Sequence, residues 1–254
     1  MLRRLALALA LVAVRFAAPG GPLPVAQPPA GSVVDGQRAA GAAGPAGWYS
    51  SNWAGYIVDG GRYTGVAGEW TVPRVDATGF PGFSAAWIGI GGVNEAALIQ
   101  VGTEQDAAGA GASYSAWWEI LPAPAVRIRS LAVRPGDTIR AAISRVAGGR
   151  WRITISDSRG GRYTTTRAWR GSGTSAEWIE EAPQVNGRPA PLAATSAVRF
   201  DLATANGRNP RLVASQAGIL VEGDAVALVP SAPDSGRDGF VISAGPALAL
   251  PPSP

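Results

Sequence analysis

The sequence predicts an all-β fold, a single antiparallel β-sandwich domain that covers residues 48–244 of the 254-residue chain. Three observations support this prediction. From Trp48 onward, short runs rich in Val, Ile, Trp and Tyr alternate with polar residues, which is the period-two pattern of strands. Gly, Pro, Asp and Ser separate the runs, and no long helical pattern is present. About 200 residues is large for one sandwich but acceptable for a single domain.

Eleven runs have the strand pattern. They cover residues 52–58, 65–72, 85–90, 97–101, 114–121, 138–146, 151–156, 163–169, 177–181, 197–202 and 212–221. Turn signals separate them at Asp59-Gly60-Gly61, Arg134-Pro135-Gly136-Asp137, Gly148-Gly149 and Ser158-Arg159-Gly160-Gly161. Gly-Gly between two strand patterns favours a hairpin.

The two ends of the chain have different compositions from the domain. Residues 1–18 are predicted to be a secretory signal peptide, because Arg3 and Arg4 precede a ten-residue apolar segment, residues 5–14. That segment is too short for a membrane span, which needs about 20 apolar residues. Residues 19–47 are rich in Pro, Gly and Ala and are predicted to be a linker or short propeptide. Residues 245–254 are predicted to be a flexible Pro-rich tail.

The composition excludes several kinds of chemistry. The chain has no His and no Cys, so it cannot use a Ser-His-Asp triad, a cysteine nucleophile or a zinc site built from these residues. All 22 basic side chains are Arg, which excludes Schiff-base chemistry. Acid–base catalysis would therefore have to come from Asp, Glu or Tyr. No metal or other cofactor is expected.

The net charge is +4, and the arginines are dispersed along the chain instead of clustered. A nucleic-acid interface would need a basic cluster with interleaved aromatic residues, so none is expected. We expect a secreted monomer that does not bind membranes after the signal is removed. Without cysteines its stability must come from its core.

Two strand-like runs contain polar residues that are costly to bury unless they are paired or used. Gln100 lies among Leu98, Ile99 and Val101, and Glu181 closes a run that contains Trp178 and Ile179. A satisfied core amide and a solvated acidic edge are the ordinary explanations for these residues. A functional site is the other explanation, and the residues alone leave both open.

The run from Tyr114 to Ile120 contains two adjacent tryptophans. Strand alternation places Trp117 and Glu119 on one face and Trp118 and Ile120 on the other. We therefore expect one tryptophan in the core and the other facing outward beside an acid. An exposed tryptophan next to a carboxylate is typical of a binding groove, but it also occurs on ordinary surfaces.

Five sequence blocks can be read together. They are Ser51-Asn52-Trp53-Ala54-Gly55, Trp87-Ile88-Gly89-Ile90-Gly91-Gly92, Leu98-Ile99-Gln100-Val101-Gly102, Ala116-Trp117-Trp118-Glu119-Ile120-Leu121-Pro122 and Ala176-Glu177-Trp178-Ile179-Glu180-Glu181. In sequence and in order they resemble the glutamic peptidases, the eqolisin family, and more closely its prokaryotic members. Departures are Gly91, Ser115 and Leu121 where the family has Asp, Asp and Tyr, and the absence of the cysteines of fungal members.

The resemblance implies a lectin-like jelly roll of two large curved sheets and a secreted acid endopeptidase that acts on polypeptides. It implies that Glu181 is the general base and that Gln100 stabilises the oxyanion. Trp53, Trp87, Trp117 and Glu119 would contact substrate and orient this pair. Two other functions remain open. One is a carbohydrate-binding module whose tryptophans stack on sugars, and the other is a glycoside hydrolase that uses Glu119 and Glu181 as its two carboxylates.

Overall fold

The computed structural model describes residues 47–93, 95–108, 111–185 and 188–253. The predicted signal peptide and nearly all of the predicted linker lie outside these residues. Within the described ranges, no helix has the length and apolar character needed to cross a membrane.

The described residues form seventeen strands and two 3-10 helices, η1 (Ala147–Gly149) and η2 (Ala214–Gln216), and contain no α-helix. The first nine strands are β1 (Trp48–Ser50), β2 (Trp53–Asp59), β3 (Gly65–Thr71), β4 (Gly82–Gly91), β5 (Leu98–Ala108), β6 (Gly111–Ile120), β7 (Val126–Arg127), β8 (Thr138–Arg145) and β9 (Arg150–Asp157). The others are β10 (Arg162–Ala168), β11 (Ser175–Glu181), β12 (Gln184–Val185), β13 (Arg188–Pro189), β14 (Val198–Ala205), β15 (Ala217–Glu222), β16 (Ala225–Pro230) and β17 (Phe240–Ala244).

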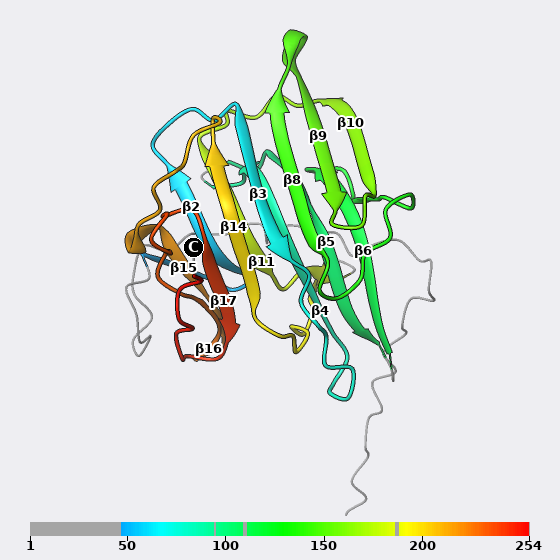
Figure 1. Ribbon diagram of the computed structural model, residues 1–254, viewed down its shortest axis with the longest axis vertical. Helices are drawn as coiled ribbons and strands as arrows, with labels where there is room; N and C mark the ends of the chain where they lie inside the picture. Colours follow the sequence, from blue (N-terminus) through cyan, green and yellow to red (C-terminus); the bar gives the residue numbers. More distant parts are fainter. Residues whose placement is uncertain (1–46, 94, 109–110, 186–187, 254) are drawn as a thin grey trace, which may run out of the picture.

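The strands build two layers, which confirms the predicted β-sandwich (Figure 1). The first layer has the order β10-β9-β8-β3-β14 and the second has the order β2-β11-β4-β5-β6-β7. Strands β17, β16 and β15 join the layers along one side, so a single hydrogen-bonded path runs through both. All pairings on this path are antiparallel, and β1 adds to β15 in parallel.

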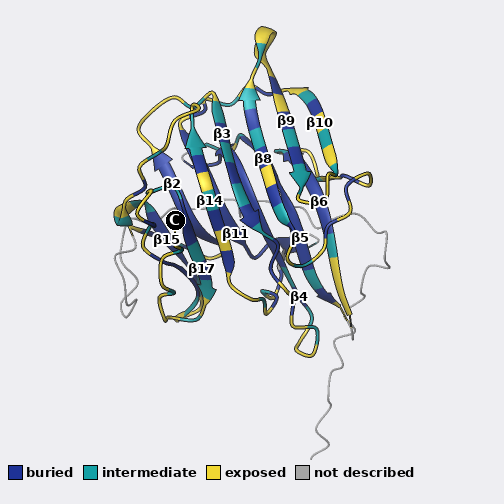
Figure 2. Ribbon diagram, in the orientation of Figure 1, coloured by how far each residue is buried: buried dark blue, intermediate teal, exposed yellow. Residues whose placement is uncertain are grey.

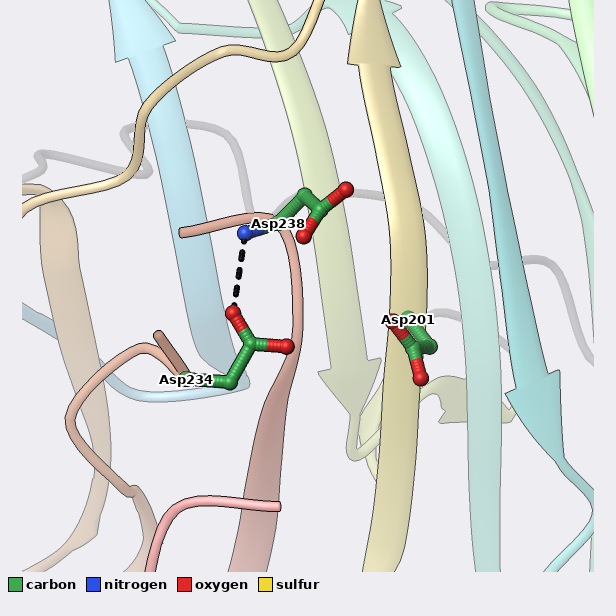
Figure 3. Close-up of side chains that lie close together, drawn as sticks. All are labelled: Asp201, Asp234 and Asp238. Atoms are coloured by element: carbon green, nitrogen blue, oxygen red, sulfur yellow. Dashed lines mark hydrogen bonds between the residues drawn. The ribbon is translucent and has the colours of Figure 1, made fainter. Parts of the chain in front are cut away.

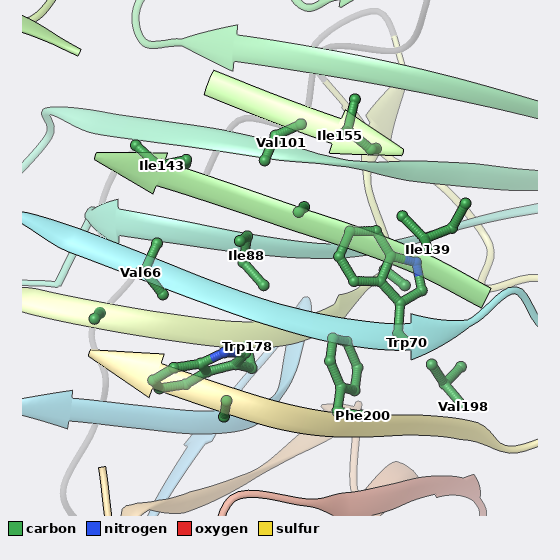
Figure 4. Packing of buried hydrophobic residues seen from close by; sticks show 14 of the residues in the cluster. Val66, Trp70, Ile88, Val101, Ile139, Ile143, Ile155, Trp178, Val198 and Phe200 are labelled. Atoms are coloured by element: carbon green, nitrogen blue, oxygen red, sulfur yellow. The ribbon is translucent and has the colours of Figure 1, made fainter. Parts of the chain in front are cut away.

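The main hydrophobic core fills the space between the layers (Figure 4). Two tryptophans also join the layers by hydrogen bonds. The indole N–H of Trp178 on β11 donates to the Ala67 carbonyl at 2.9 Å, and that of Trp70 on β3 donates to the Thr103 hydroxyl at 2.9 Å. A Cβ atom at Gly68 would lie 2.9 Å from the Trp178 ring, so glycine is what lets the layers approach here. This contact positions β11 against the first layer.

Each predicted run contains a strand, but the sequence missed several elements. Strands β16 and β17 and the short strands β1, β7, β12 and β13 were not predicted. The hairpin signals at Gly148-Gly149 and in residues 158–161 are confirmed, since they join β8 to β9 and β9 to β10. The hairpin expected at Asp59-Gly60-Gly61 is wrong. There the chain leaves one layer for the other, because β2 pairs with β11 and β15 while β3 pairs with β8 and β14.

The face of the second layer that points away from the main core is also buried. Figure 2 shows β4, β5 and β11 mostly in the colour of buried residues. A second hydrophobic cluster lies on this face: Trp48, Trp53, Ile57, Ala85, Trp87, Val93, Leu98, Trp117 and Ile179. We call this surface the site face, because Gln100, Glu119 and Glu181 share it by strand alternation.

The expectation of an outward, exposed tryptophan beside Glu119 is therefore wrong in one respect. Trp117 and Trp118 do lie on opposite faces, in the second cluster and the main core respectively. However, Trp117 is only 2 % exposed. Alternation correctly predicted the face of the sheet on which Trp117 lies. It could not show that this face is also buried, by the neighbouring tryptophans of the second cluster.

Candidate active site

Strand register arranges the site face in rows that run across the second layer. One row contains Trp53, Glu181, Ala85, Glu104 and Ser115. The next contains Gly55, Ile179, Trp87, Gly102 and Trp117. The third contains Ile57, Glu177, Gly89, Gln100 and Glu119. Two rows of polar groups thus flank a central row that carries two tryptophans.

Glu181 is held by donors from two different segments. The Asn52 amide nitrogen donates to its Oε1 at 3.1 Å, and the Trp87 indole N–H donates to its Oε2 at 2.8 Å. Burial raises the pKa of this carboxyl to about 7, while Trp53, Trp87 and Asn52 lower it by favouring the ionised form. The sequence did not single out Asn52, although it belongs to the Ser-Asn-Trp block just before β2.

Gln100 is buried on β5 directly opposite Glu119 on β6. Its amide nitrogen donates to Glu119 Oε2 at 2.6 Å. Burial raises the pKa of Glu119 to about 8, the Gln100 bond lowers it, and the negative charge of Glu181 raises it. Glu119 and Glu181 therefore interact electrostatically, although they lie in different rows.

The tryptophans of the site face pack against one another. The rings of Trp53 and Trp87 are 5.1 Å apart and nearly perpendicular, which is the favoured edge-to-face geometry. The Trp117 ring leans over Gly102, where an added Cβ would lie 3.0 Å from it and 2.6 Å from the Cβ of Trp87. The structure thus brings all six predicted site residues to one face of one sheet.

Three further buried carboxyls lie on these strands. Glu104 and Glu177 share the site face, and burial raises the pKa of each well above its usual value. Counting in steps of two from Gln100 would have found Glu104. Glu180 points the other way, into the interlayer core. Burial raises its pKa to about 8, against the lowering effect of the neighbouring Ser84 and Gln105 side chains, although neither of its carboxylate oxygens accepts a hydrogen bond from the described residues.

One acidic cluster in the described residues has the geometry to hold a cation, and it lies away from the site face. Oxygen atoms of Asp201, Asp234 and Asp238 lie within 4.8 Å of one another (Figure 3). These groups already have partners. Arg199 donates to Asp201 at 2.7 Å, and the Asp238 backbone N–H donates to Asp234 at 3.2 Å. The cluster contributes no group to the rows around Glu181.

Comparisons with known proteins identify the family and the fold. Residues 51–229 match the model of the peptidase A4 family. Aspergillopepsin-2 from Aspergillus niger is 29 % identical over 159 residues, which are 52 % of this chain and 56 % of that protein. The chain thus spans about half the length of this curated relative.

Two solved structures share the fold. The scytalido-glutamic peptidase bound to a transition state analog inhibitor aligns with a TM-score of 0.65 and 22 % identity, over 76 % of this chain and 98 % of that one. Aspergilloglutamic peptidase from Aspergillus niger aligns with a TM-score of 0.55 and 23 % identity, over 64 % of this chain and 98 % of that one. The resemblance found in the sequence is confirmed by the match over residues 51–229: the chain belongs to the peptidase A4 family.

Proposed function

We propose that this protein is a secreted acid endopeptidase in which Glu181 is the general base and Gln100 stabilises the oxyanion. The observation that carries the proposal is the position of both residues on the buried site face, each held by named partners. Polar groups buried at this cost are expected to be paired, used in chemistry, or both. Membership of a peptidase family supports the choice of peptide bonds as substrate.

In the proposed reaction the Glu181 carboxylate takes a proton from a water molecule, and the resulting hydroxide adds to the scissile carbonyl carbon. The carbonyl oxygen becomes an oxyanion and accepts a hydrogen bond from the Gln100 amide. Glu181 then gives its proton to the amide nitrogen as the C–N bond breaks, which releases a carboxylic acid and an amine. A positioned base contributes about 10²–10⁴ in rate and an oxyanion donor about 10²–10³.

The surrounding residues have supporting roles in this proposal. Asn52 and Trp87 hold the Glu181 carboxylate, and Glu119 fixes the orientation of the Gln100 amide. Trp53 and Trp117 supply apolar surface around the reacting peptide. The carbohydrate-binding alternative is not supported by the family match, which is to a peptidase family. The glycosidase alternative required Glu119 as an independent acid, whereas it is bonded to Gln100.

Two opposing effects of pH limit the proposed activity, one on the acid side and one on the alkaline side. The base must be ionised, and the ionised fraction of Glu181 grows as the pH rises toward its pKa of about 7. Burial favours the protonated form of other carboxyls, such as Glu180. The free energy of unfolding therefore falls as the pH rises and these groups ionise. With these values the proposed activity rises as the pH approaches about 7 and falls where the fold is lost at higher pH.

The decisive experiment compares three variants on a denatured protein substrate in mildly acidic buffer. Glu181→Gln and Gln100→Ala should each lower kcat/KM by at least about 100-fold while the circular dichroism spectrum stays that of the wild type. Glu180→Gln is the matched control. It changes an adjacent buried glutamate that faces the interlayer core, and it should keep most of the activity. An active Glu181→Gln enzyme would refute the proposed mechanism.

A further inference from the structure

Ser50 closes β1, and its buried hydroxyl takes part in three hydrogen bonds. The backbone N–H groups of Asn52 and Trp53 each donate to Ser50 Oγ at 3.2 Å. The third bond joins Ser50 Oγ to Asn52 Oδ1 at 2.9 Å. A serine that accepts from backbone groups two and three positions later is a recurrent turn motif, so these bonds shape the turn that leads into β2. The reaction proposed above gives Ser50 no role.

The number of hydrogens on the serine determines which way the Asn52 amide points. A hydroxyl has one hydrogen and two lone pairs. The two backbone N–H groups occupy the lone pairs of Ser50, which leaves its hydrogen for Asn52 Oδ1. The amide oxygen therefore faces Ser50, and the amide nitrogen faces Glu181, where it donates to Oε1 at 3.1 Å.

The backbone of Asn52 is held beside Glu181 independently of this amide. The Ala182 N–H donates to the Asn52 carbonyl at 2.8 Å, and Glu181 is paired with Trp53 on β2. The last torsion of an asparagine side chain is soft and roughly two-fold, so the amide could be reversed without moving the backbone. Its oxygen would then face the Glu181 carboxylate. Two acceptors repel each other unless the carboxyl carries a proton, so the orientation of the amide selects between the charged and the neutral form of Glu181.

We infer that Ser50 is a positioning residue that fixes the Asn52 amide in the orientation that supports the ionised base. The inference rests on the proposed function, since it assumes that ionised Glu181 takes the proton from water. Burial already raises the pKa of Glu181 to about 7, and N–H donors lower it. Without the Ser50 hydroxyl the amide spends part of its time reversed, and the pKa of Glu181 rises further.

Three other titratable groups interact with Glu181, and the serine acts on none of them directly. They are Glu104 on β5, Glu119 on β6 and Glu180 on β11 itself. Burial raises the pKa of each, and the negative charge of Glu181 raises it further. Within the described residues, the side chains of Ser50 and Asn52 make no hydrogen bond to these three carboxyls. A change at Ser50 therefore reaches Glu181 through Asn52.

The first test is the pH dependence of kcat/KM for Ser50→Ala. We expect the acid limb to move upward by about 0.5–1 pH unit, which lowers kcat/KM about 3- to 10-fold at about pH 5. Ser231→Ala is the matched control. The Ser231 hydroxyl is also buried, accepts the Val241 N–H at 3.0 Å and donates to the Ala232 carbonyl at 2.8 Å, but it lies beside β16 and β17. An equal displacement of the acid limb in both variants would overturn the inference, because lost stability would then explain it.

The second test asks whether Ser50 acts through Asn52. Asn52→Ala alone removes the donor and should move the acid limb upward by about one to two pH units. Adding Ser50→Ala to this variant should cause no further displacement, because no amide remains to be oriented. A further displacement as large as that of Ser50→Ala alone would overturn the inference. If Ser50→Ala does not fold, Ser50→Cys replaces it in each comparison, since a thiol is similar in size but a weak donor.

The third test measures Glu181 without using activity. Its carboxyl carbon is followed by NMR in ¹³C-glutamate-labelled wild type and Ser50→Ala, and is identified by its absence in Glu181→Gln. The titration midpoint should rise by the same amount as the acid limb, about 0.5–1 pH unit. An unchanged midpoint in folded Ser50→Ala would overturn the role of Ser50. A raised midpoint with an unmoved acid limb would keep that role and refute Glu181 as the base.

Discussion

Glu181 shows how one carboxyl can be placed between two opposing effects. Removing the group from water favours the neutral acid, while donors arranged around it favour the anion. The balance leaves the pKa of Glu181 at about 7, below that of its neighbour Glu180 at about 8, although both are buried on the same strand. The difference comes from the indole and amide N–H groups on the site face. The carboxylate oxygens of Glu180 accept no hydrogen bond from the described residues.

The indole N–H of Trp87 can be removed by Trp87→Phe. This change deletes a donor to an ionised group, which is worth about 1.5–3 kcal/mol, or about one to two pH units in the pKa of the acceptor. The acid limb of the kcat/KM profile should therefore move to higher pH. Trp117→Phe is the control, because it removes the same indole portion from a ring in the same row without removing a donor to Glu181. An acid limb that moves equally in both variants would show that packing and not the donor is responsible.

At the scale of the strand, most of what the sequence predicts about the site comes from the alternation of side chains between the two faces of a strand. Alternation correctly separated Trp117 from Trp118 onto opposite faces. It could not give register between strands, because pairing partners are distant in sequence. Three features of the site depend on this register. They are the contact of Gln100 with Glu119, the contact of Glu181 with Asn52, and the alignment of Glu104 with Glu181 in one row. Strands β16 and β17 were missed because turn-forming residues interrupt that part of the chain.

The contact between β3 and β11 gives a test at this scale. A Cβ atom at Gly68 would lie 2.9 Å from the Trp178 ring, so Gly68→Ala must push the layers apart or displace a buried indole. Overpacking of this kind costs about 1–3 kcal/mol. We expect a lower urea midpoint and a loss of the Trp178 bond to Ala67. Gly65→Ala on the same strand is the control, since its nearest neighbour would be a carbonyl oxygen at an ordinary 3.5 Å. Equal destabilisation by both substitutions would contradict this account.

The whole molecule combines a basic surface with a buried acidic interior. The chain carries a net charge of +4, yet Glu104, Glu119, Glu177, Glu180 and Glu181 are almost fully enclosed. Burial raises the pKa of every one of them. In the unfolded chain these groups would ionise near pH 4.5. Burial that raises the pKa of a carboxyl for proton transfer therefore also makes the fold more stable at acidic pH than at alkaline pH.

That link predicts how stability depends on pH, and Glu180 is the group that tests it most directly. Its folded pKa of about 8 is raised above its unfolded value, so its contribution is fully present below about pH 4.5 and is lost as the pH rises through about 8. The loss is of the order of several kcal/mol. Urea unfolding of the wild type should therefore show a falling free energy between pH 5 and 8. Glu180→Gln, which cannot ionise, should flatten this slope, whereas Glu222→Gln at an exposed strand end should not. A slope that is unchanged in Glu180→Gln would mean that Glu180 does not contribute to the alkaline weakness of the fold.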